Sequence, residues 1–144
     1  MKKLPHNQFF EIYSKVPRLC VEVVIIQSNG ILLTLRDIPP AKGFWTFPGG
    51  TVNYGESVLD TVRRTAKEEI GVDIKIIKFL GYNDWETNKN ATGHSVSLLF
   101  LAKIIDGKIR TDFQAKEARF FKKLPENMVE EDKKFIEENS LMVV

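Results

Sequence analysis

Residues 50–72 read GTVNYGESVLDTVRRTAKEEIGV, and they contain the most regular hydrophobic pattern of the chain. Apolar side chains recur at spacings of three and four at Leu59, Val62, Ala66 and Ile70. This spacing places them on one stripe of a helix, which we predict over residues 56–70. Gly71 follows where a glycine commonly ends a helix in the left-handed conformation.

The last turn of this helix carries two acidic residues, Glu68 and Glu69. The carbonyl end of a helix is partly negative, so each exposed carboxylate there costs about 0.3–1 kcal/mol. Neighbouring helix positions differ by about 100° in direction. Both carboxylates can therefore reach one hard cation such as Mg²⁺ or Mn²⁺. Arg64, four residues earlier, is spaced to hold Glu68. The alternative is a solvated helix face with ordinary ion pairs.

The segment before the helix, residues 48–56, contains one proline and three glycines between a short predicted strand and the helix. Glycines allow a backbone to approach a ligand closely. A Pro-Gly-Gly sequence alone usually marks a turn. Its position directly before a helix with an acidic end favours a binding loop.

The remaining pattern predicts an α+β layered domain. We expect a short helix over residues 7–13 and a final helix over 127–138, with Asn127 as its N-cap. Valine- and isoleucine-rich or alternating segments predict strands over residues 19–27, 31–36, 44–47, 74–80, 94–105 and 118–121. No repeat or linker divides the 144 residues, so we expect a single domain over residues 1–144.

Composition narrows the class of protein. The 21 Lys and Arg residues against 19 Asp and Glu give a net charge of +2, which predicts no nucleic-acid footprint. A single cysteine, Cys20, cannot form an intrachain disulfide or a two-cysteine zinc site. No apolar run approaches the roughly 20 residues that span a bilayer, and the first residues lack a signal-peptide core. We expect a cytoplasmic protein without a membrane partner.

The stretch of residues 50–72 resembles the Nudix box. In that family pattern a Gly is followed after five residues by a Glu and after seven more by Arg-Glu-apolar-any-Glu-Glu-any-Gly-apolar. Gly50, Glu56, Arg64 and residues 68–72 match it, whereas Thr65 replaces a family Glu. The resemblance implies an α/β/α sandwich with a mixed sheet between helices.

The resemblance also implies a function. Nudix enzymes hydrolyse a nucleoside diphosphate linked to another group, with Mg²⁺ or Mn²⁺. Glu68, Glu69 and the backbone carbonyl of Gly50 would be the metal ligands, with Glu69 also catalytic. Arg64 would orient carboxylates, including Glu56. By the same resemblance the chain could form a homodimer.

The departure at Thr65 leaves the general base open. In many family members the Glu at this position binds metal or acts as the base, and a threonine hydroxyl does neither well. Our candidate replacement is Glu117, which precedes a short predicted strand. His94, after a polar loop, is a second candidate. Each of the two also fits an ordinary surface or strand-end residue.

A second resemblance concerns the substrate. Phe9 and Phe10, Pro17, and residues 36–45 are similar to the GDP-mannose mannosyl hydrolase branch, which implies that Arg36 contacts the diphosphate. Phe9, Trp45 and Trp85 are candidates to stack on a base or sugar. That branch lacks the Glu that matches Glu68 and uses a late histidine, whereas no histidine follows His94 here.

Three functions follow as hypotheses. The first is a metal-dependent hydrolase of a nucleoside diphosphate derivative, a GDP-mannose-like nucleotide sugar. The second is a weakened Nudix domain that binds a nucleotide without turning it over, with Thr65 marking the loss. The third is a pyrophosphohydrolase of a mononucleotide triphosphate.

Overall fold

The computed structural model describes residues 3–39, 41–85, 93–111 and 115–142. Its elements follow the chain in this order: α1 (His6–Tyr13), β1 (Arg18–Gln27), β2 (Gly30–Arg36), β3 (Trp45–Thr46), β4 (Gly49–Thr51), α2 (Val58–Ile70), β5 (Asp73–Trp85), β6 (Ser95–Asp106), β7 (Ala115–Phe121) and α3 (Glu130–Glu138).

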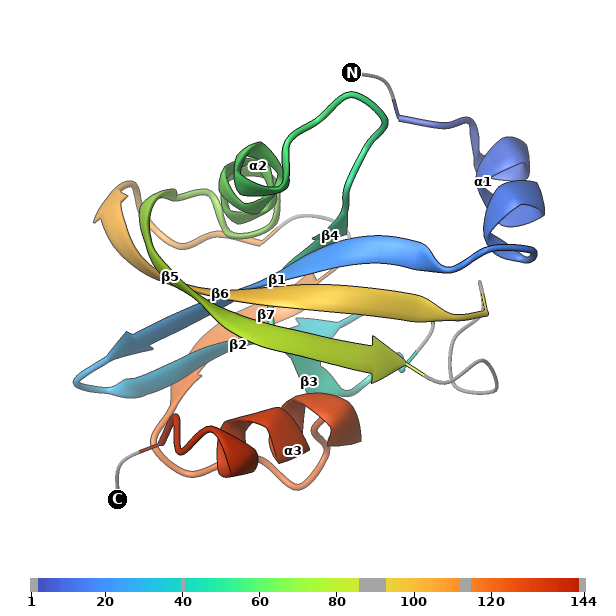
Figure 1. Cartoon of the computed structure of the whole chain (residues 1–144). Helices are drawn as coiled ribbons and strands as arrows, with labels where there is room; N and C mark the ends of the chain where they lie inside the picture. Colours follow the sequence, from blue (N-terminus) through green and yellow to red (C-terminus); the bar gives the residue numbers. More distant parts are fainter. Residues whose placement is uncertain (1–2, 40, 86–92, 112–114, 143–144) are drawn as a thin grey trace.

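The strands form one mixed sheet between helices. Its strand order is β3-β2-β1-β6-β5, with β4 added on β1 and β7 on β2. β1 and β6 run parallel, and the other pairs are antiparallel. Helices α2 and α3 cover opposite sides of the sheet, and α1 lies at one end (Figure 1). The predicted α+β sandwich is confirmed.

Strand β1 divides the core because its side chains alternate between the two faces. Val21, Val23 and Ile25 are fully buried with the α2 residues Val62 and Ala66. On the other face, the core around α3 contains Val24 of β1. Two hydrophobic cores thus fix the sheet from both sides.

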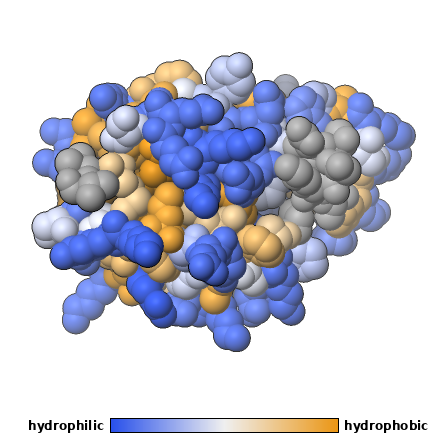
Figure 2. Space-filling view, turned by 90° about the horizontal axis from the view of Figure 1, so that it is seen from below, coloured by the Kyte–Doolittle hydropathy of each residue, from blue (hydrophilic) through white to orange (hydrophobic). Residues whose placement is uncertain are grey.

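The final helix starts later than predicted. It begins at Glu130, and its N-cap position is Val129 rather than Asn127. The Asn127 amide instead donates to the Gly43 carbonyl at 2.9 Å, which ties this segment to the loop before β3. The outward side of α3 is highly charged, and hydrophilic groups cover much of the face seen from below (Figure 2).

Two further differences concern the strands. β4 was not predicted, because two of its three residues are glycines with low strand propensity. β5 extends to Trp85, five residues beyond the predicted end at Leu80, along its ladder with β6. Both differences add residues to the site described below. In the part of the chain that the structure describes, no helix is long and apolar enough to cross a membrane.

Candidate active site

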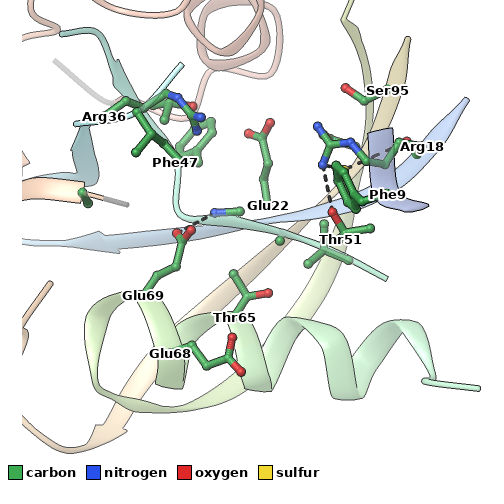
Figure 3. A pocket seen from close by; sticks show the side chains of 18 of the residues that line it. Phe9, Arg18, Glu22, Arg36, Phe47, Thr51, Thr65, Glu68, Glu69 and Ser95 are labelled. Atoms are coloured by element: carbon green, nitrogen blue, oxygen red, sulfur yellow. Dashed lines mark hydrogen bonds between the residues drawn. The ribbon is translucent and has the colours of Figure 1, made fainter. Parts of the chain in front are cut away.

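A cavity of about 640 Å³ lies between α1, β1, β4 and the end of α2. This volume is typical of small-molecule sites. Figure 3 shows the acidic end of α2 on one side of the β1 and β4 ribbons, and Arg18, Glu22 and Arg36 on the other. The cavity therefore continues from the acidic residues to a second, polar wall.

Arg64 is the centre of a hydrogen-bond network on the α2 side. Its Nε donates to Glu56 at 2.7 Å, and its two terminal nitrogens donate to Glu68 at 3.2 Å and to the Thr51 carbonyl at 2.8 Å. The guanidinium lowers the pKa of Glu56, bonds from Thr61 and the Asn53 N–H add to this effect and burial opposes it, and together they bring the pKa to about 2. Arg64 therefore contacts both Glu56 and Glu68, the carboxylates that it was expected to orient.

The two acidic residues at the helix end lie in different surroundings. Glu69 is half-buried and accepts the backbone N–H of Gly49 at 2.9 Å. Glu68 is more exposed and pairs with Arg64 and, at 3.3 Å, with Lys3 from the N-terminal arm. Gly71 ends the helix in the left-handed conformation, as predicted. Glu69 is thus fixed against β4, while Glu68 faces solvent.

Thr65 faces Gly50 beneath this acidic pair. A Cβ atom at Gly50 would lie 2.5 Å from the Thr65 hydroxyl oxygen, so the close approach requires glycine. Thr65 is fully buried, and its hydroxyl has no hydrogen-bond partner among the described residues. The substitution of the family Glu by Thr therefore leaves a small, tightly packed polar group under Gly50, without a hydrogen-bond partner among the described residues.

The residues at this end fit a hard divalent cation. They supply two carboxylates, Glu68 and Glu69, beside the backbone of Gly50, next to the unpartnered hydroxyl of Thr65. Within the described residues no group of three or more His, Cys, Asp or Glu side chains could hold a metal. Two carboxylates with a carbonyl suit Mg²⁺, which keeps several waters in its shell.

The opposite wall contains Glu22 of β1, whose carboxyl group is buried next to that of Asp132 of α3, a residue that does not line the cavity. Burial raises the pKa of Glu22 well above its usual value, and the charge of Asp132 raises it further. Burial also raises the pKa of Asp132, but hydrogen bonds from Thr46 and the Phe47 N–H oppose this shift. The hydrogen bond between the two carboxyl groups raises the pKa of Glu22 and lowers the pKa of Asp132.

Sequence reasoning missed two residues of this wall, Arg18 and Glu22, and the carboxyl group that contacts Glu22, Asp132. A signal for Glu22 existed, because it is a lone charge inside the apolar run of β1. Asp132 had no such signal, since its partner Thr46 lies 86 residues away.

The predicted substrate-binding residues divide into two groups. Phe9, Arg36 and Trp85 line the cavity. Burial lowers the pKa of Arg36, and the charge of Glu69 opposes this effect. Trp45 is buried against Phe121 and is not among the residues that line the cavity.

Neither predicted base candidate lines the cavity. Glu117 of β7 pairs with Arg119. Ala115, two residues before Glu117, lines the cavity and pairs with Arg36, but a bulge follows it and Glu117 pairs with Leu35, so Glu117 lies on the opposite face of the strand. His94 lies 3.4 Å from Asp84.

Comparisons with known proteins agree with this fold. The family model for the NUDIX domain matches residues 16–139. The low-salt glycan biosynthesis protein Agl8 of Haloferax volcanii is 32% identical over 124 residues, covering 83% of this chain and 80% of that protein. An ADP-ribose pyrophosphatase of Methanocaldococcus jannaschii is 37% identical over 105 residues, and the match covers 73% of this chain and 62% of that protein.

A solved structure gives the same result. The crystal structure of a MutT NUDIX hydrolase from Burkholderia pseudomallei superposes with a TM-score of 0.78 at 26% identity, covering 90% of this chain and all of that one. The family model spans well over half of the chain. The chain therefore belongs to the Nudix family of hydrolases.

Proposed function

We propose that this chain hydrolyses a nucleotide sugar or a close analogue, a nucleoside diphosphate linked to a second group, with Mg²⁺ or Mn²⁺. The observation that carries the proposal is one continuous cavity with two different ends. Glu68 and Glu69 stand at one end, Glu22 lies between the ends beside Gly49 (Figure 3), and Arg18 and Trp85 line the other end. Such a cavity can hold a charged diphosphate and a polar group beyond it.

Each residue at the acidic end has a defined task in this proposal. Glu68, Glu69 and the Gly50 carbonyl would hold the metal ion, with Glu69 kept in place by the Gly49 N–H. A bound divalent ion neutralises charge on the diphosphate and lowers the pKa of a bound water. Arg36 would contact the diphosphate oxygens through charge-assisted hydrogen bonds.

We propose Glu117 as the general base, with His94 as the alternative. The Thr65 hydroxyl cannot accept a proton at neutral pH, so another group must do so if the substrate is turned over. Glu117 lies two residues along β7 from the cavity-lining Ala115, and its side chain would have to turn toward the cavity to act. If E117Q keeps kcat while H94A abolishes it, His94 replaces Glu117 in this role.

The length of the cavity agrees with a nucleotide sugar. A nucleoside triphosphate carries other groups on one side of its phosphates only, whereas a nucleotide sugar carries groups on both sides of its diphosphate, and Arg18, Glu22 and Ser97 offer hydrogen-bonding groups to one of them. The relative Agl8 carries glycan biosynthesis in its name, which agrees with a sugar-bearing substrate.

The alternative function is a nucleotide-binding domain without turnover. The buried Thr65 supports it, because the family Glu is missing. The retained Glu68 and Glu69 argue against it, since carboxylates at a helix carboxyl end lower stability and are expected to persist where they serve a ligand.

The test is a panel of nucleotide sugars, dinucleoside polyphosphates, NADH and nucleoside triphosphates, incubated with Mg²⁺ with and without chelator. We expect chelator-sensitive hydrolysis of nucleotide sugars, lost in E69Q and kept in the control E138Q on the exposed side of α3. Free sugar with a nucleoside diphosphate indicates attack at carbon, and two monophosphates indicate attack at phosphorus. Nucleotide binding without turnover of any compound would support the binding domain instead.

A further inference from the structure

The second end of the cavity contains a polar row across three strands. Arg18 of β1 pairs with Ser95 of β6, which in turn pairs with Trp85 of β5. Directly paired residues on neighbouring strands point to the same face of a sheet. Arg18, Ser95 and Trp85 all line the cavity, and we call these three residues the Arg18–Trp85 corner.

Arg18 is held in place on two sides. One terminal nitrogen donates to the Thr51 hydroxyl at 2.8 Å and to the Cys20 sulfur at 3.0 Å. The guanidinium carbon lies 5.7 Å from the centre of the Phe9 ring, a cation–π distance. Its position is thus fixed without a carboxylate partner among the described residues.

Two donors in the corner have no acceptor. The Nε of Arg18 and the indole Nε1 of Trp85 are buried and make no hydrogen bond with the described residues. Trp85 is 9% exposed. Leaving a buried donor unsatisfied is costly, more so for a charged group, and such groups call for an explanation.

The two unpartnered atoms are both donors, and this defines the chemistry of the ligand. Both unpartnered atoms carry hydrogen, so they need acceptors, and both belong to residues that line one cavity. A guanidinium and an indole N–H are matched by an oxygen with free lone pairs, such as a carbonyl, a carboxylate or a sugar oxygen. An apolar group would leave them unsatisfied.

We propose that the Arg18–Trp85 corner is a specificity-determining subsite that binds an oxygen acceptor on the part of the substrate away from the metal end. This inference rests on the proposed function, because it assigns a further contact to the same cavity. The oxygen belongs either to the nucleobase or to the second group on the diphosphate. Arg18 contributes the charge, and Trp85 contributes a rigid single donor.

Equilibrium binding tests this subsite without turnover. Affinities of the full chain are measured by calorimetry with chelator present, for GDP, UDP and ADP and for the matching GDP-mannose, UDP-glucose, UDP-glucuronate and ADP-ribose. The variants are R18M, which removes the guanidinium, and W85F, which removes the N–H and keeps a ring. R63M is the matched control, since Arg63 is an exposed arginine of α2 paired with Asp60 outside the cavity.

We expect R18M to weaken binding about 10- to 100-fold and W85F several-fold, with R63M unchanged, as for lost hydrogen bonds to charged and neutral donors. If the variants also bind the plain nucleoside diphosphates more weakly, the oxygen belongs to the base. Losses confined to compounds with a second group assign it there.

Unchanged affinities in both R18M and W85F would overturn the subsite, because water would then satisfy the two donors. Absence of saturable binding of any compound by the unmodified chain would also count against it. Turnover is assayed separately with Mg²⁺. Hydrolysis with unchanged affinities rejects the subsite alone, and weakened binding without any hydrolysis rejects the proposed function alone.

Discussion

Two arginines hold Thr51 of β4 from opposite sides of the cavity, and their surroundings differ. Arg64 binds the Thr51 carbonyl together with the carboxylates of Glu56 and Glu68. Arg18 binds the Thr51 hydroxyl and the Cys20 sulfur, and its buried Nε has no acceptor in the part of the chain that the structure describes. Among these residues Arg64 finds its partners within the protein, whereas two donors of the Arg18–Trp85 corner do not.

The difference between the two arginines indicates that Arg64 serves the stability of the fold and Arg18 the binding of a ligand. A charge that the chain itself pairs and hydrogen-bonds contributes to folding, so its removal is expected to lower the free energy of unfolding. A polar group that the chain leaves unpaired lowers stability and gains its partner only from a ligand. The comparison therefore predicts large stability losses around Arg64 and small ones around Arg18.

The largest effect is expected from Arg64→Met. This change leaves the carboxylate of Glu56, whose side chain is 3% exposed, without its partner. Breaking a buried ion pair on one side typically costs about 3–5 kcal/mol. Urea unfolding at pH 7 measures the loss, with R63M as the matched control, because an exposed ion pair such as that of Arg63 contributes about 0–1 kcal/mol. Equal losses of stability in both variants would show that the Arg64 network contributes no more than an exposed ion pair.

The charge on Glu56 gives a pH-dependent version of this test. Its pKa is about 2 in the folded chain against an ordinary value of 4.5. A lowered pKa stabilises the fold at pH above the unfolded value, and this stabilisation is lost as pH falls toward 2. We expect wild type to exceed E56Q by about 3 kcal/mol at pH 7, from 2.5 pKa units. The difference should vanish near pH 2, and a difference independent of pH would contradict the assignment.

A smaller effect is expected from Gly50→Ala, which tests the contact between β4 and α2. The new Cβ would lie 2.5 Å from the Thr65 hydroxyl, and such overpacking costs about 1–3 kcal/mol. Removing the hydroxyl in the double variant with Thr65→Ala should restore most of that loss. Unfolding free energies of the two single variants and the double variant give the coupling. If the losses of unfolding free energy in the two single variants simply add in the double variant, the new Cβ at Gly50 does not clash with the Thr65 hydroxyl.

The sequence predicted the α2 side of the site better than the opposite wall, for a physical reason. The helix stripe, the Gly71 end and the spacing of Arg64 to Glu68 are local features, determined by neighbours three to four residues apart. The closing of the network by Glu56 was also expected, through the family resemblance. These elements form with the partners that their spacing indicates.

The opposite wall depends on pairings between distant segments. The row of Arg18, Ser95 and Trp85 joins three strands, and its register cannot be obtained from any one of them. Strand β4 is a strand because it pairs with Cys20–Glu22 of β1, which outweighs its glycines. Trp45 was predicted to stack on a base or sugar, but its side chain is buried in the core around α3.

The smallest expected effect is the loss of stability in Trp85→Phe without ligand. The variant removes one donor that has no acceptor among the described residues and keeps an aromatic ring in a largely buried position. Deleting an unsatisfied buried donor is close to neutral or slightly stabilising, so we expect a change within about 1 kcal/mol. Thermal unfolding with and without a saturating nucleotide measures both states. Because ligand binding adds stability in proportion to the logarithm of its affinity, wild type should gain more than W85F on adding the nucleotide. A large loss without ligand would instead show that Trp85 supports the fold, and the contrast between the two halves of the cavity would disappear.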